Sequence, residues 1–180
     1  FNVLNSIIML SDIDEHKMHH LLDAFRDFLS ASFDFENTEI EVPIEQELDL
    51  VRAYLTIEQI RFENRIKLIW EIDEALVFLL PPLTIQTLVE NAIKHGILTK
   101  AEGGTIHIIV QKRDDTAIIV SIQDNGLGFD TQQQKEASEK RGIGIPNTDF
   151  RLKQLYGTGL HIKSNLGEGT TVSFEIPIHK

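Results

Sequence analysis

The sequence predicts an α+β fold in which a helical hairpin precedes a two-layer α/β sandwich, with helices covering one face of a mixed, mostly antiparallel sheet. Apolar residues recur every three or four positions through residues 1–62, which is typical of helices. In residues 63–180, segments with alternate apolar residues indicate half-buried strands, and helical and glycine-rich segments separate them. Strands mixed with helices in this way favour a sheet covered by helices.

The N-terminal part of the chain is expected to form two helices. Phe1, Leu4 and Ile8 lie on one helical stripe. Residues 11–14 interrupt this stripe, and Asp14 is suited to cap the next helix. The stripe of that second helix consists of Met18, Leu22, Phe25 and Leu29. Because two short helices bury little apolar surface alone, we expect the hairpin to dimerise into a four-helix bundle. Packing of the hairpin on its own domain is the alternative.

A third helix is expected to link the hairpin to the rest of the chain. Residues 33–42 are polar and indicate a linker, and the helix runs from Pro43 to about Phe62. One apolar face carries Ile44, Leu48, Val51 and Leu55, and a second carries Leu50, Tyr54 and Ile57. Two apolar faces predict a helix that is packed on both sides. The chain is therefore expected to divide into a hairpin with its linker, residues 1–42, and a linking helix with the sandwich domain, residues 43–180.

Alternation, proline and glycine indicate the remaining elements. Residues 65–73 alternate between apolar and polar side chains, as a half-buried strand does. Pro81 and Pro82 then open a helix that ends at Gly96, since proline favours the first turn of a helix and glycine its end. One antiparallel hairpin is expected to pair residues 105–111 with 116–124, and a second to pair residues 160–164 with 170–177. One more helix is expected at residues 146–156.

Composition limits the classes of function. Of the 180 residues, 42% are hydrophobic and 25% are charged, an ordinary balance for a globular protein, and no apolar run approaches the roughly 20 residues of a membrane span. Cysteine is absent, which excludes disulfides and thiolate metal sites. A net charge of −11 disfavours nucleic acid and anionic lipid as partners, so any nucleotide site must be built locally. Because the chain opens on Phe1 rather than Met, we expect it to be part of a longer protein.

Three polar motifs follow one another in the second half, and the first is ENAIKHG at residues 90–96. Helical spacing predicts that the face toward the sheet carries Leu88, Val89, Ala92 and Ile93. The opposite face carries Thr87, Asn91, Lys94 and His95. The amide oxygen of Asn91 suits a hard cation such as Mg²⁺, and Lys94 one turn further on suits phosphate oxygens. An amphipathic surface helix that carries these residues by chance is the alternative for this motif alone.

The second motif, DNGLGF at residues 124–129, follows a predicted strand. We expect this strand to deliver Asp124 into a tight turn in which Gly126 and Gly128 adopt positive φ. A buried carboxylate at a strand end can accept a hydrogen bond from an exocyclic amino group, such as the one on adenine. An ordinary Asn-Gly turn is the alternative.

The third motif, GIGIPN at residues 142–147, precedes a helix. The backbone N–H groups around Gly142 and Gly144 are expected to face an anion, and the helix dipole favours the same anion. A flexible loop that caps the helix is the alternative. The polar stretch between Phe129 and Arg141 has few apolar anchors, and we expect it to form a mobile lid between the second and third motifs.

In combination, ENxxKHG, DxGxGF and GxGIxN resemble the N, G1 and G2 boxes of the GHKL ATP-binding superfamily, which holds gyrase-type ATPases, Hsp90 chaperones, MutL-type repair proteins and histidine kinases. GEGTTVSF at residues 167–174 resembles the last hairpin of the kinase branch. FNVLNSI at residues 1–7 resembles the tail of the Pro-His-Phe-Leu-Phe-Asn box of LytS-like sensor histidine kinases, and YLTIEQIRF at residues 54–62 resembles the helix before their ATP-binding domain. The resemblance covers nearly the whole chain. It implies a Bergerat-type ATP-binding fold after a partial dimerisation and histidine-phosphotransfer hairpin.

The resemblance implies a role for each motif residue. Asn91 would ligate Mg²⁺, Lys94 would contact phosphate, and Glu90 would have a general-base-like role toward the attacking group. The residues expected around the adenine are Asp124, which reads its N6, Gly126 and Gly128, which let it approach, and Thr170 or Thr171, often through water. The residues expected around the phosphates are Gly142, Gly144 and, on the helix that follows, Asn147 and Arg151. Surface packing is the alternative for Arg151, and helix capping is the alternative to His95 lining the site.

The implied function is that of the cytoplasmic kinase core of a two-component sensor histidine kinase. ATP, with Mg²⁺ as cofactor, would donate its γ-phosphate to a histidine expected three residues before Phe1, and an aspartate of a response regulator would then receive it. His16, His19 and His20 do not match that position, and a solvated helix face is expected for them. The resemblance also implies a homodimer through the N-terminal helices. Upstream segments would anchor the full-length protein in the cytoplasmic membrane, without direct membrane contact by this chain.

Three other classes share parts of these patterns. A GHKL-type ATPase would carry a transducer domain downstream of the last hairpin. A nucleotide-binding scaffold without kinase activity would have degenerate boxes, whereas all three boxes are intact here. An anti-sigma-factor kinase, which phosphorylates serine, would not need the helical hairpin. A histidine kinase therefore accounts for more of the sequence than these alternatives do.

Overall fold

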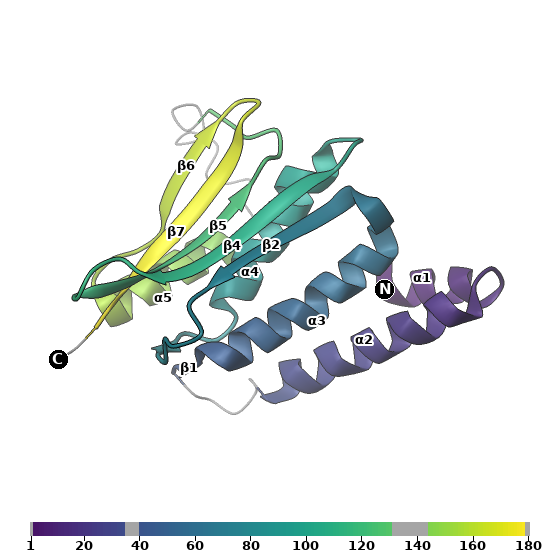
Figure 1. Ribbon diagram of the computed structural model, residues 1–180, viewed down its shortest axis with the longest axis horizontal. Coiled ribbons are helices and arrows are strands. Elements are labelled where there is room, and N and C mark those ends of the chain that lie inside the picture. Colours follow the sequence, from purple (N-terminus) through teal and green to yellow (C-terminus); the bar gives the residue numbers. More distant parts are fainter. Residues whose placement is uncertain (1, 35–39, 131–143, 179–180) are drawn as a thin grey trace.

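The chain folds into a five-stranded sheet with helices on one face and a two-helix hairpin beyond them (Figure 1). The computed structural model describes residues 2–34, 40–130 and 144–178. The helices are α1 (Asn2–Ser11), α2 (Glu15–Asp34), α3 (Ile44–Phe62), α4 (Thr84–Asn91) and α5 (Gly144–Tyr156). The strands of the sheet are β2 (Ile66–Ile72), β4 (Gly104–Lys112), β5 (Ala117–Asp124), β6 (His161–Asn165) and β7 (Gly169–Pro177).

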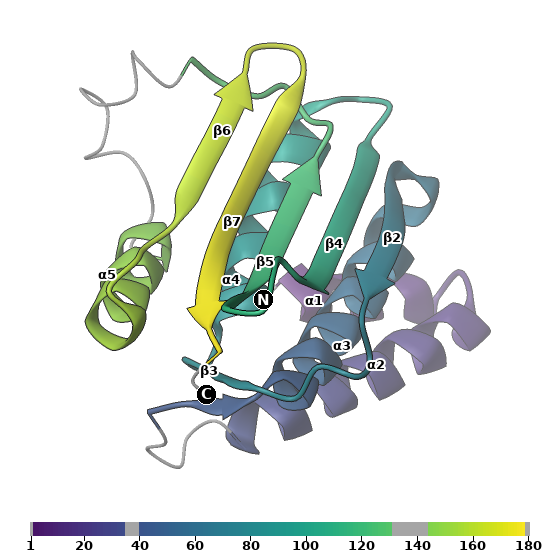
Figure 2. The ribbon, with the colours of Figure 1, turned by 60° about the vertical axis from the view of Figure 1, so that its left-hand side comes forward.

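The strands follow the order β2-β4-β5-β7-β6 across the sheet. β2 and β4 are parallel, whereas the other neighbouring pairs are antiparallel. A parallel pair needs a crossover connection, and here the chain between β2 and β4 passes through α4 behind the sheet (Figure 2). The predicted α+β fold, with a mixed and mostly antiparallel sheet covered by helices on one face, is confirmed.

The main hydrophobic core lies between the sheet and these helices. Alternate residues of the two central strands β4 and β5 point into it because successive side chains of a strand face opposite sides. The strand residues in this core include Ile106, Ile108, Ile118, Val120 and Ile122, all at most 4% exposed. Burial of one such side chain stabilises the fold by about 1.5–3 kcal/mol. This packing holds α4 against the sheet.

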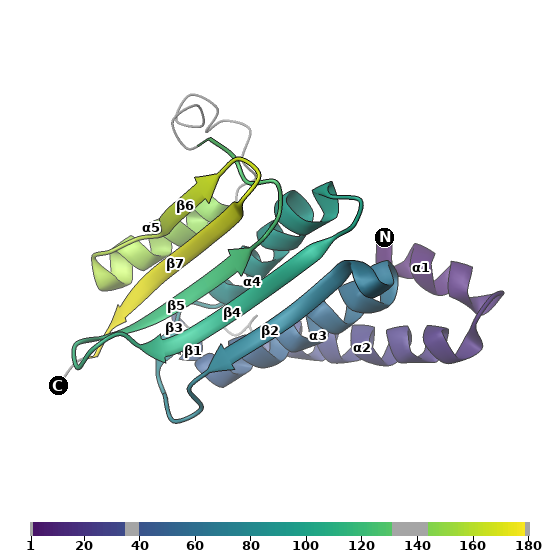
Figure 3. The ribbon, with the colours of Figure 1, turned by 45° about the horizontal axis from the view of Figure 1, so that its top comes forward.

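Helix α3 is packed on both sides, as its two apolar faces predict. Val51 and Leu55 belong to the main core with the sheet. Ile57 belongs to a second, smaller core with Leu21 and Ala24 of α2. The hairpin of α1 and α2 lies beyond α3, on the side away from the sheet (Figure 3). α3 therefore connects the hairpin to the sandwich by packing as well as by sequence.

The hairpin contacts α3 mainly through residues of α2 that lie beside the predicted stripe. Leu21 and Ala24 are buried, whereas Leu22 and Leu29 of the predicted stripe are 39% and 37% exposed. Ile8, on the predicted stripe of α1, is 65% exposed. Phe25 of the predicted stripe packs against the smaller core and Met18 is half-buried, so only part of the predicted α2 stripe remains on the surface.

Some local predictions are wrong in detail. Helix α2 continues to Asp34, into the expected linker. The two-residue strands β1 (Val42–Pro43) and β3 (Leu79–Leu80) pair in antiparallel fashion, and strands this short show no alternating pattern. The helix that ends at Gly96 is α-helical only to Asn91 and continues as a π-helix over Ala92–Gly96. Across the described parts of the chain, no helix combines the length and apolar character that a membrane span requires.

Candidate functional site

Asn91 lies at the end of α4, on the side that faces away from the sheet. Leu88 and Val89 of the same helix are buried against the sheet, and Asn91 is half-buried. Its Nδ2 donates a hydrogen bond to the backbone oxygen of Thr87 at 2.7 Å. That bond uses the donor end of the amide and leaves Oδ1 as a ligand for a hard cation or an acceptor for water.

Lys94 and Glu90 form an ion pair one helical turn apart. The Nε2 of Gln86 also donates to Oε2 of Glu90 at 3.4 Å. The Lys94 and Glu90 side chains are 56% and 34% exposed, and an exposed i,i+4 pair stabilises a helix by only about 0.3–0.5 kcal/mol. A phosphate group can therefore take Lys94 from Glu90 with little loss of stability, which leaves the Glu90 carboxylate able to accept a proton.

Two ionisable residues of α3 lie near this pair and are not among the predicted site residues. Glu58 is 7% exposed and accepts a hydrogen bond from Nη1 of Arg61 at 2.6 Å. Burial raises the pKa of Glu58, while the charges of Arg61 and Lys94 oppose that rise. Burial and the carboxylates of Glu58 and Glu90 raise the pKa of the Tyr54 hydroxyl. Glu58 stands on an otherwise apolar helix face three residues before Arg61, and this pattern could have indicated it.

The first and second motifs meet at Gly96. A β-carbon on Gly96 would lie 2.5 Å from Oδ1 of Asp124, and a β-carbon on Gly126 would lie 2.4 Å from Cα of Gly96. Glycine is therefore required at both positions, because a side chain at either one would clash with the neighbouring segment. The predicted positive φ occurs at Gly128, at +59°, but not at Gly126. At Gly126 the absence of a side chain is needed for space rather than for backbone conformation.

Asp124 is held at the end of β5 by backbone donors. The N–H of Gly126 donates to its Oδ1 at 2.9 Å. Burial raises the pKa of the Asp124 carboxyl, whereas hydrogen bonds from the N–H groups of Gly126 and Thr170 and the charge of Lys100 act in the opposite direction. Asp124 and Thr170 are paired across β5 and β7. The result is a partly buried carboxylate that can accept a hydrogen bond from a ligand.

Ser164 ties the glycine-rich turn to the last hairpin. Its Oγ accepts the N–H of Phe129 at 2.9 Å, donates to the backbone oxygen of Gly169 at 3.0 Å and lies 2.9 Å from Oγ1 of Thr170. Gly128 approaches the same hairpin, since a β-carbon there would lie 2.0 Å from the backbone oxygen of Asn165. The turn after Asp124 is thus fixed by the β6–β7 hairpin.

The third motif meets the first at the start of α5. A β-carbon on Gly144 would lie 2.9 Å from Cγ2 of Thr87 and 3.9 Å from Nδ2 of Asn91. Gly142 and most of the stretch expected to form a lid lie outside the described residues. Helix α4 with its π-helical end therefore lies against the third motif at Thr87, one turn before Asn91, and against the second motif at Gly96.

The other predicted site residues differ in exposure and in the direction they face. Asn147 and His95 are exposed on their helices. Arg151 is half-buried, and its Nη1 donates to the backbone oxygen of Pro82 at 2.5 Å. Thr171 pairs with Gln123, one residue along from the pair of Asp124 and Thr170, so its side chain faces the other side of the sheet.

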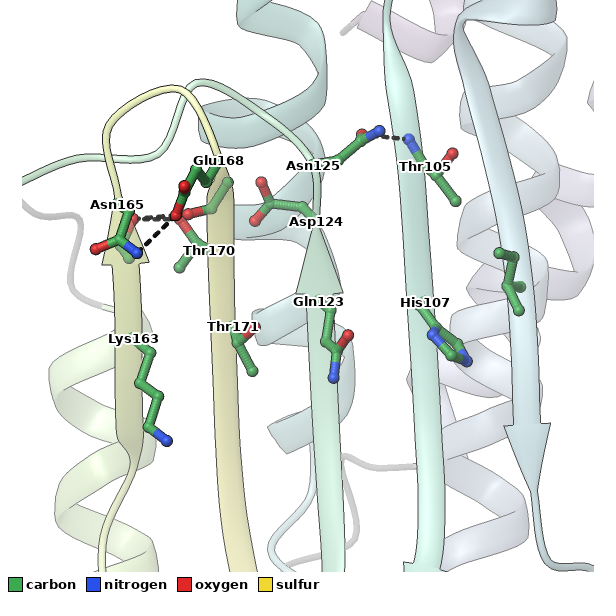
Figure 4. A pocket seen from close by; sticks show the side chains of 13 residues that line it. Thr105, His107, Gln123, Asp124, Asn125, Lys163, Asn165, Glu168, Thr170 and Thr171 are labelled. Carbon is green, nitrogen blue, oxygen red and sulfur yellow. Dashed lines mark hydrogen bonds between the residues drawn. The ribbon is translucent and has the colours of Figure 1, made fainter.

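A hollow of about 440 Å³ opens on that other face. The four neighbouring side chains that stand in front of the strands in Figure 4 are those of Lys163, Thr171, Gln123 and His107. The helices lie behind the strands in this view. Asn91 ends α4, and Lys94 belongs to the π-helical segment that follows it. Asp124 and Thr170 line only the end of the hollow near the glycine-rich turn. The hollow is therefore not the place where the three motifs meet.

The residues at the meeting point suit a metal-bound nucleotide. Asn91 offers a single neutral oxygen ligand. No group of three or more His, Cys, Asp and Glu side chains suited to a metal occurs in residues 2–34, 40–130 and 144–178. Mg²⁺ usually combines few protein ligands with waters and substrate phosphates, so a single amide oxygen fits it. A self-contained metal site does not fit these residues.

Comparisons with known proteins agree along the whole chain. Residues 1–66 match the family described as Histidine kinase, and residues 82–180 match the family described as Histidine kinase-, DNA gyrase B-, and HSP90-like ATPase. The chain is 38% identical over 179 residues to YwpD of Bacillus subtilis, covering 98% of this chain and 64% of that protein. It is 35% identical over 181 residues to sensor histidine kinase YpdA of Escherichia coli, and 34% identical over 188 residues to sensor protein LytS of Bacillus cereus. These two alignments cover 98% of this chain but only 32% and 31% of those proteins, so the chain spans about a third of their length.

Solved structures share the fold. The histidine kinase domain of a blue-light activated histidine kinase from Erythrobacter litoralis matches with a TM-score of 0.59 and 16% identity, covering 97% of this chain and 82% of that one. The catalytic domain of histidine kinase ThkA matches with a TM-score of 0.57 and 23% identity, covering 76% of this chain and 94% of that one. The match of residues 82–180 shows that the chain belongs to the histidine kinase-, DNA gyrase B- and HSP90-like ATPase family, and its relatives include LytS sensor proteins.

Proposed function

We propose that the chain is the kinase core of a two-component sensor histidine kinase, which binds Mg-ATP and transfers its γ-phosphate to a histidine. The observation that carries this proposal is the meeting of the three motifs on one helix. Gly144 lies against Thr87, one turn before Asn91 on that helix, and Asp124 lies against Gly96 at its other end. This arrangement provides a phosphate side and an adenine side in one site.

On the adenine side, the carboxylate of Asp124 accepts a hydrogen bond from the exocyclic amino group of the base. The backbone bonds that hold Asp124 support this role because they fix the carboxylate before the ligand arrives. Gly126 and Gly128 let the turn after Asp124 pack closely on Gly96 and on the β6–β7 hairpin, which supports Asp124 in this role. Thr170 lies beside Asp124 and contributes directly or through water, and we place Thr171 outside the contact with the base because it faces the other side of the sheet.

On the phosphate side, Oδ1 of Asn91 would hold Mg²⁺, and Lys94 would turn from Glu90 to the phosphates. The backbone around Gly142 and Gly144 binds phosphate at the N-terminus of α5. When bound, Mg²⁺ neutralises charge on the transferred group. We place His95 and Asn147, which are exposed, at the rim of the nucleotide site.

In the transfer step, an imidazole nitrogen of the acceptor histidine attacks the γ-phosphorus. A P–N bond forms, the bond from that phosphorus to the β,γ-bridging oxygen breaks, and ADP leaves with the electron pair. Glu90 accepts the proton that the imidazole gives up, in a general-base-like role. The acceptor histidine is assigned to a position three residues before Phe1, which follows from the resemblance of residues 1–7 to the LytS-like box. A response-regulator aspartate then takes the phosphoryl group.

The hairpin of α1 and α2 is proposed to form the homodimer. Apolar side chains that stay exposed on it support this proposal, since two copies of the hairpin could bury them in a four-helix bundle. These side chains are Leu4, Ile8, Leu22, Leu29 and Phe33. We accordingly assign residues 1–42 to a partial dimerisation and phosphotransfer unit with its linker, and residues 43–180 to the linking helix and the ATP-binding domain.

We place this kinase core in the cytoplasm and propose that other segments of the full-length protein anchor it in the cytoplasmic membrane. The net charge of −11 supports a core that does not itself contact anionic lipid or nucleic acid. Its macromolecular partners are then a second copy of the chain and the cognate response regulator.

Calorimetric titration of Mg-ATP into the chain tests the nucleotide site. Binding that falls in both Asn91→Ala and Asp124→Asn is the expected result, and affinity unchanged in both would overturn the proposal.

Incubation with radiolabelled ATP tests the assignment of the acceptor. We expect no acid-labile label on the chain alone and transfer to a partner that supplies the LytS-like box with its histidine. Acid-labile label on the chain alone would contradict this assignment.

A further inference from the structure

Glu47 is a fully buried carboxylate in the first turns of α3, outside all three motifs. Its exposed fraction is 0%. Its Oε1 accepts the backbone N–H of Leu83, and its Oε2 accepts the N–H of Ile85 at 2.8 Å. These N–H groups belong to the N-terminal turn of α4, which lacks partners within its own helix. A side chain of α3 therefore caps the helix that carries Asn91.

The cap is made to an unusual turn. Leu83 has φ +61° and ψ +21°, a left-handed conformation that few residues other than glycine adopt. The side chain of Leu83 makes no capping hydrogen bond of its own. Such a conformation persists only where its surroundings hold it. The Glu47 carboxylate, which binds the N–H groups on either side of Thr84, supplies that hold.

Arg151 of α5 reaches the same turn from the other side. Its Nη1 donates to the backbone oxygen of Pro82 at 2.5 Å, and its positive charge acts on the Glu47 carboxylate. The Oγ1 of Thr84 donates to the backbone oxygen of Pro81 at 2.6 Å, which closes the turn. Glu47 and Arg151 thus hold the segment before α4 between α3 and α5.

A short series of contacts joins this turn to the phosphate side of the nucleotide site. The N–H of Thr87 donates to the backbone oxygen of Leu83 at 3.2 Å, and its Oγ1 donates to the same oxygen at 2.5 Å. Thr87 also contacts Gly144 and accepts the hydrogen bond of the Asn91 amide. Asp124 lies at the opposite end of this helix, beside Gly96. A shift at Leu83 would therefore move Asn91 and the start of α5 before it moved the adenine side.

We propose that Glu47 is a positioning residue for the phosphate half of the nucleotide site, which it aligns by fixing the N-terminal turn of α4 against α3. Helix α3 also packs against the hairpin through Ile57. The hydrogen bonds from the start of α4 to Glu47 therefore let the linking helix and the phosphate side of the site move together. The proposal rests on the proposed nucleotide function. It also makes a separate claim: binding of the phosphates depends on Glu47, whereas binding of the adenosine part of the ligand does not.

The test uses Glu47→Gln, which keeps the shape of the side chain but presents one amide NH₂ to backbone donors. Glu45→Gln is the matched control, since Glu45 lies two residues away on α3 and is exposed. Calorimetry measures affinity for Mg-ATP, and competition against a fluorescent ATP analogue measures affinity for adenosine. Hydrogen exchange of the nucleotide-free chain compares the exchange rates of the amides of residues 83–91 with those of β5 and β7. Urea unfolding shows that each variant is folded.

We expect Glu47→Gln to bind Mg-ATP roughly tenfold more weakly, as is common when a supporting residue of a site is lost, and to bind adenosine as the unmodified chain does. Amides of residues 83–91 should exchange faster in this variant while those of β5 and β7 do not, and Glu45→Gln should change nothing. Equal losses for both ligands, or unchanged exchange and affinity, would overturn the proposal while the nucleotide function stood. Absence of Mg-ATP binding by the unmodified chain would overturn the proposed function and, with it, the role of Glu47 in that site.

Discussion

Gly96 and Asp124 are in direct contact, so close that a β-carbon on the glycine would stand 2.5 Å from the carboxylate oxygen Oδ1. Gly96 ends the helical segment that carries Asn91, and Asp124 ends β5. The contact therefore sets the distance between the two halves of the proposed nucleotide site. Neither residue can shift toward the other, and neither can gain volume without moving its partner.

Replacing Gly96 with alanine should damage this contact. We expect Gly96→Ala to displace the Asp124 carboxylate, to weaken Mg-ATP binding at least roughly tenfold, and to lower the free energy of unfolding by about 1–3 kcal/mol. Gly157→Ala is the control, because Gly157 has φ +74° and no heavy atom within 4 Å of an added β-carbon. The control should lose about 1 kcal/mol through backbone strain and keep its nucleotide affinity. Full affinity in Gly96→Ala would show that the contact does not constrain the site.

Asp124→Asn should weaken adenine recognition. The variant exchanges a charged acceptor for a neutral amide, and a hydrogen bond to a charged group stabilises a complex by about 1.5–3 kcal/mol. We therefore expect affinity for Mg-ATP to fall roughly 10- to 100-fold in calorimetry. Asp115→Asn, whose side chain is 89% exposed in the β4–β5 turn, makes the same chemical change away from the site. A similar decrease in both variants would point to net charge rather than to adenine recognition.

Glu47 should make stability depend on pH. Burial raises its pKa from 4.5 to about 7, although the N–H groups of Ile85, Leu83 and Gln86 and the charge of Arg151 oppose the rise. Because the folded chain holds the proton more tightly, the proton-linked stabilisation at Glu47 is full below about pH 4.5 and is lost as the pH rises through 7, by about 3 kcal/mol. The hydrogen bonds that Glu47 accepts from Leu83 and Ile85 are a separate contribution.

Urea unfolding at pH 5 and pH 8 measures this dependence. The loss of stability between the two pH values should be smaller in Glu47→Gln than in the unmodified chain, because glutamine does not titrate. Glu45→Gln, with its exposed side chain, should keep the full dependence. Identical pH dependence in all three proteins would mean that the buried carboxyl titrates near its ordinary pKa.

Introducing charge on the hairpin should separate the proposed dimer. Ile8 and Leu22 are 65% and 39% exposed, so Ile8→Glu with Leu22→Glu should leave the fold intact while placing four carboxylates in the dimer core. We expect a shift from dimer to monomer in sedimentation equilibrium, with nucleotide affinity unchanged. Val77→Glu is the control, since Val77 is 81% exposed and lies outside the hairpin. A dimer that survives the double substitution would place the interface elsewhere.

Local sequence patterns were sufficient for most elements of the fold. The two apolar faces of α3 predicted burial on both sides, and Val51 and Ile57 do lie in different cores. The spacing around Asn91 separated the residues that face the sheet from those that do not. These predictions succeed because periodicity reflects which side of an element is buried, and an element has this property before it packs.

Contacts between segments far apart in the chain were decided by the tertiary structure. Glu47 reads from the sequence as an ordinary polar residue of a helix, yet packing buries it against Leu83, 36 positions away. The sequence does not distinguish Thr170 from Thr171 as the residue near the adenine. The pairing of β5 with β7 does, because it puts Thr170 beside Asp124. Two-residue strands and the approach of Gly144 to Asn91 likewise leave no periodic trace. A periodic pattern along the chain predicts which side of an element a side chain faces. The residue that it contacts there depends on how the sheet and helices pack.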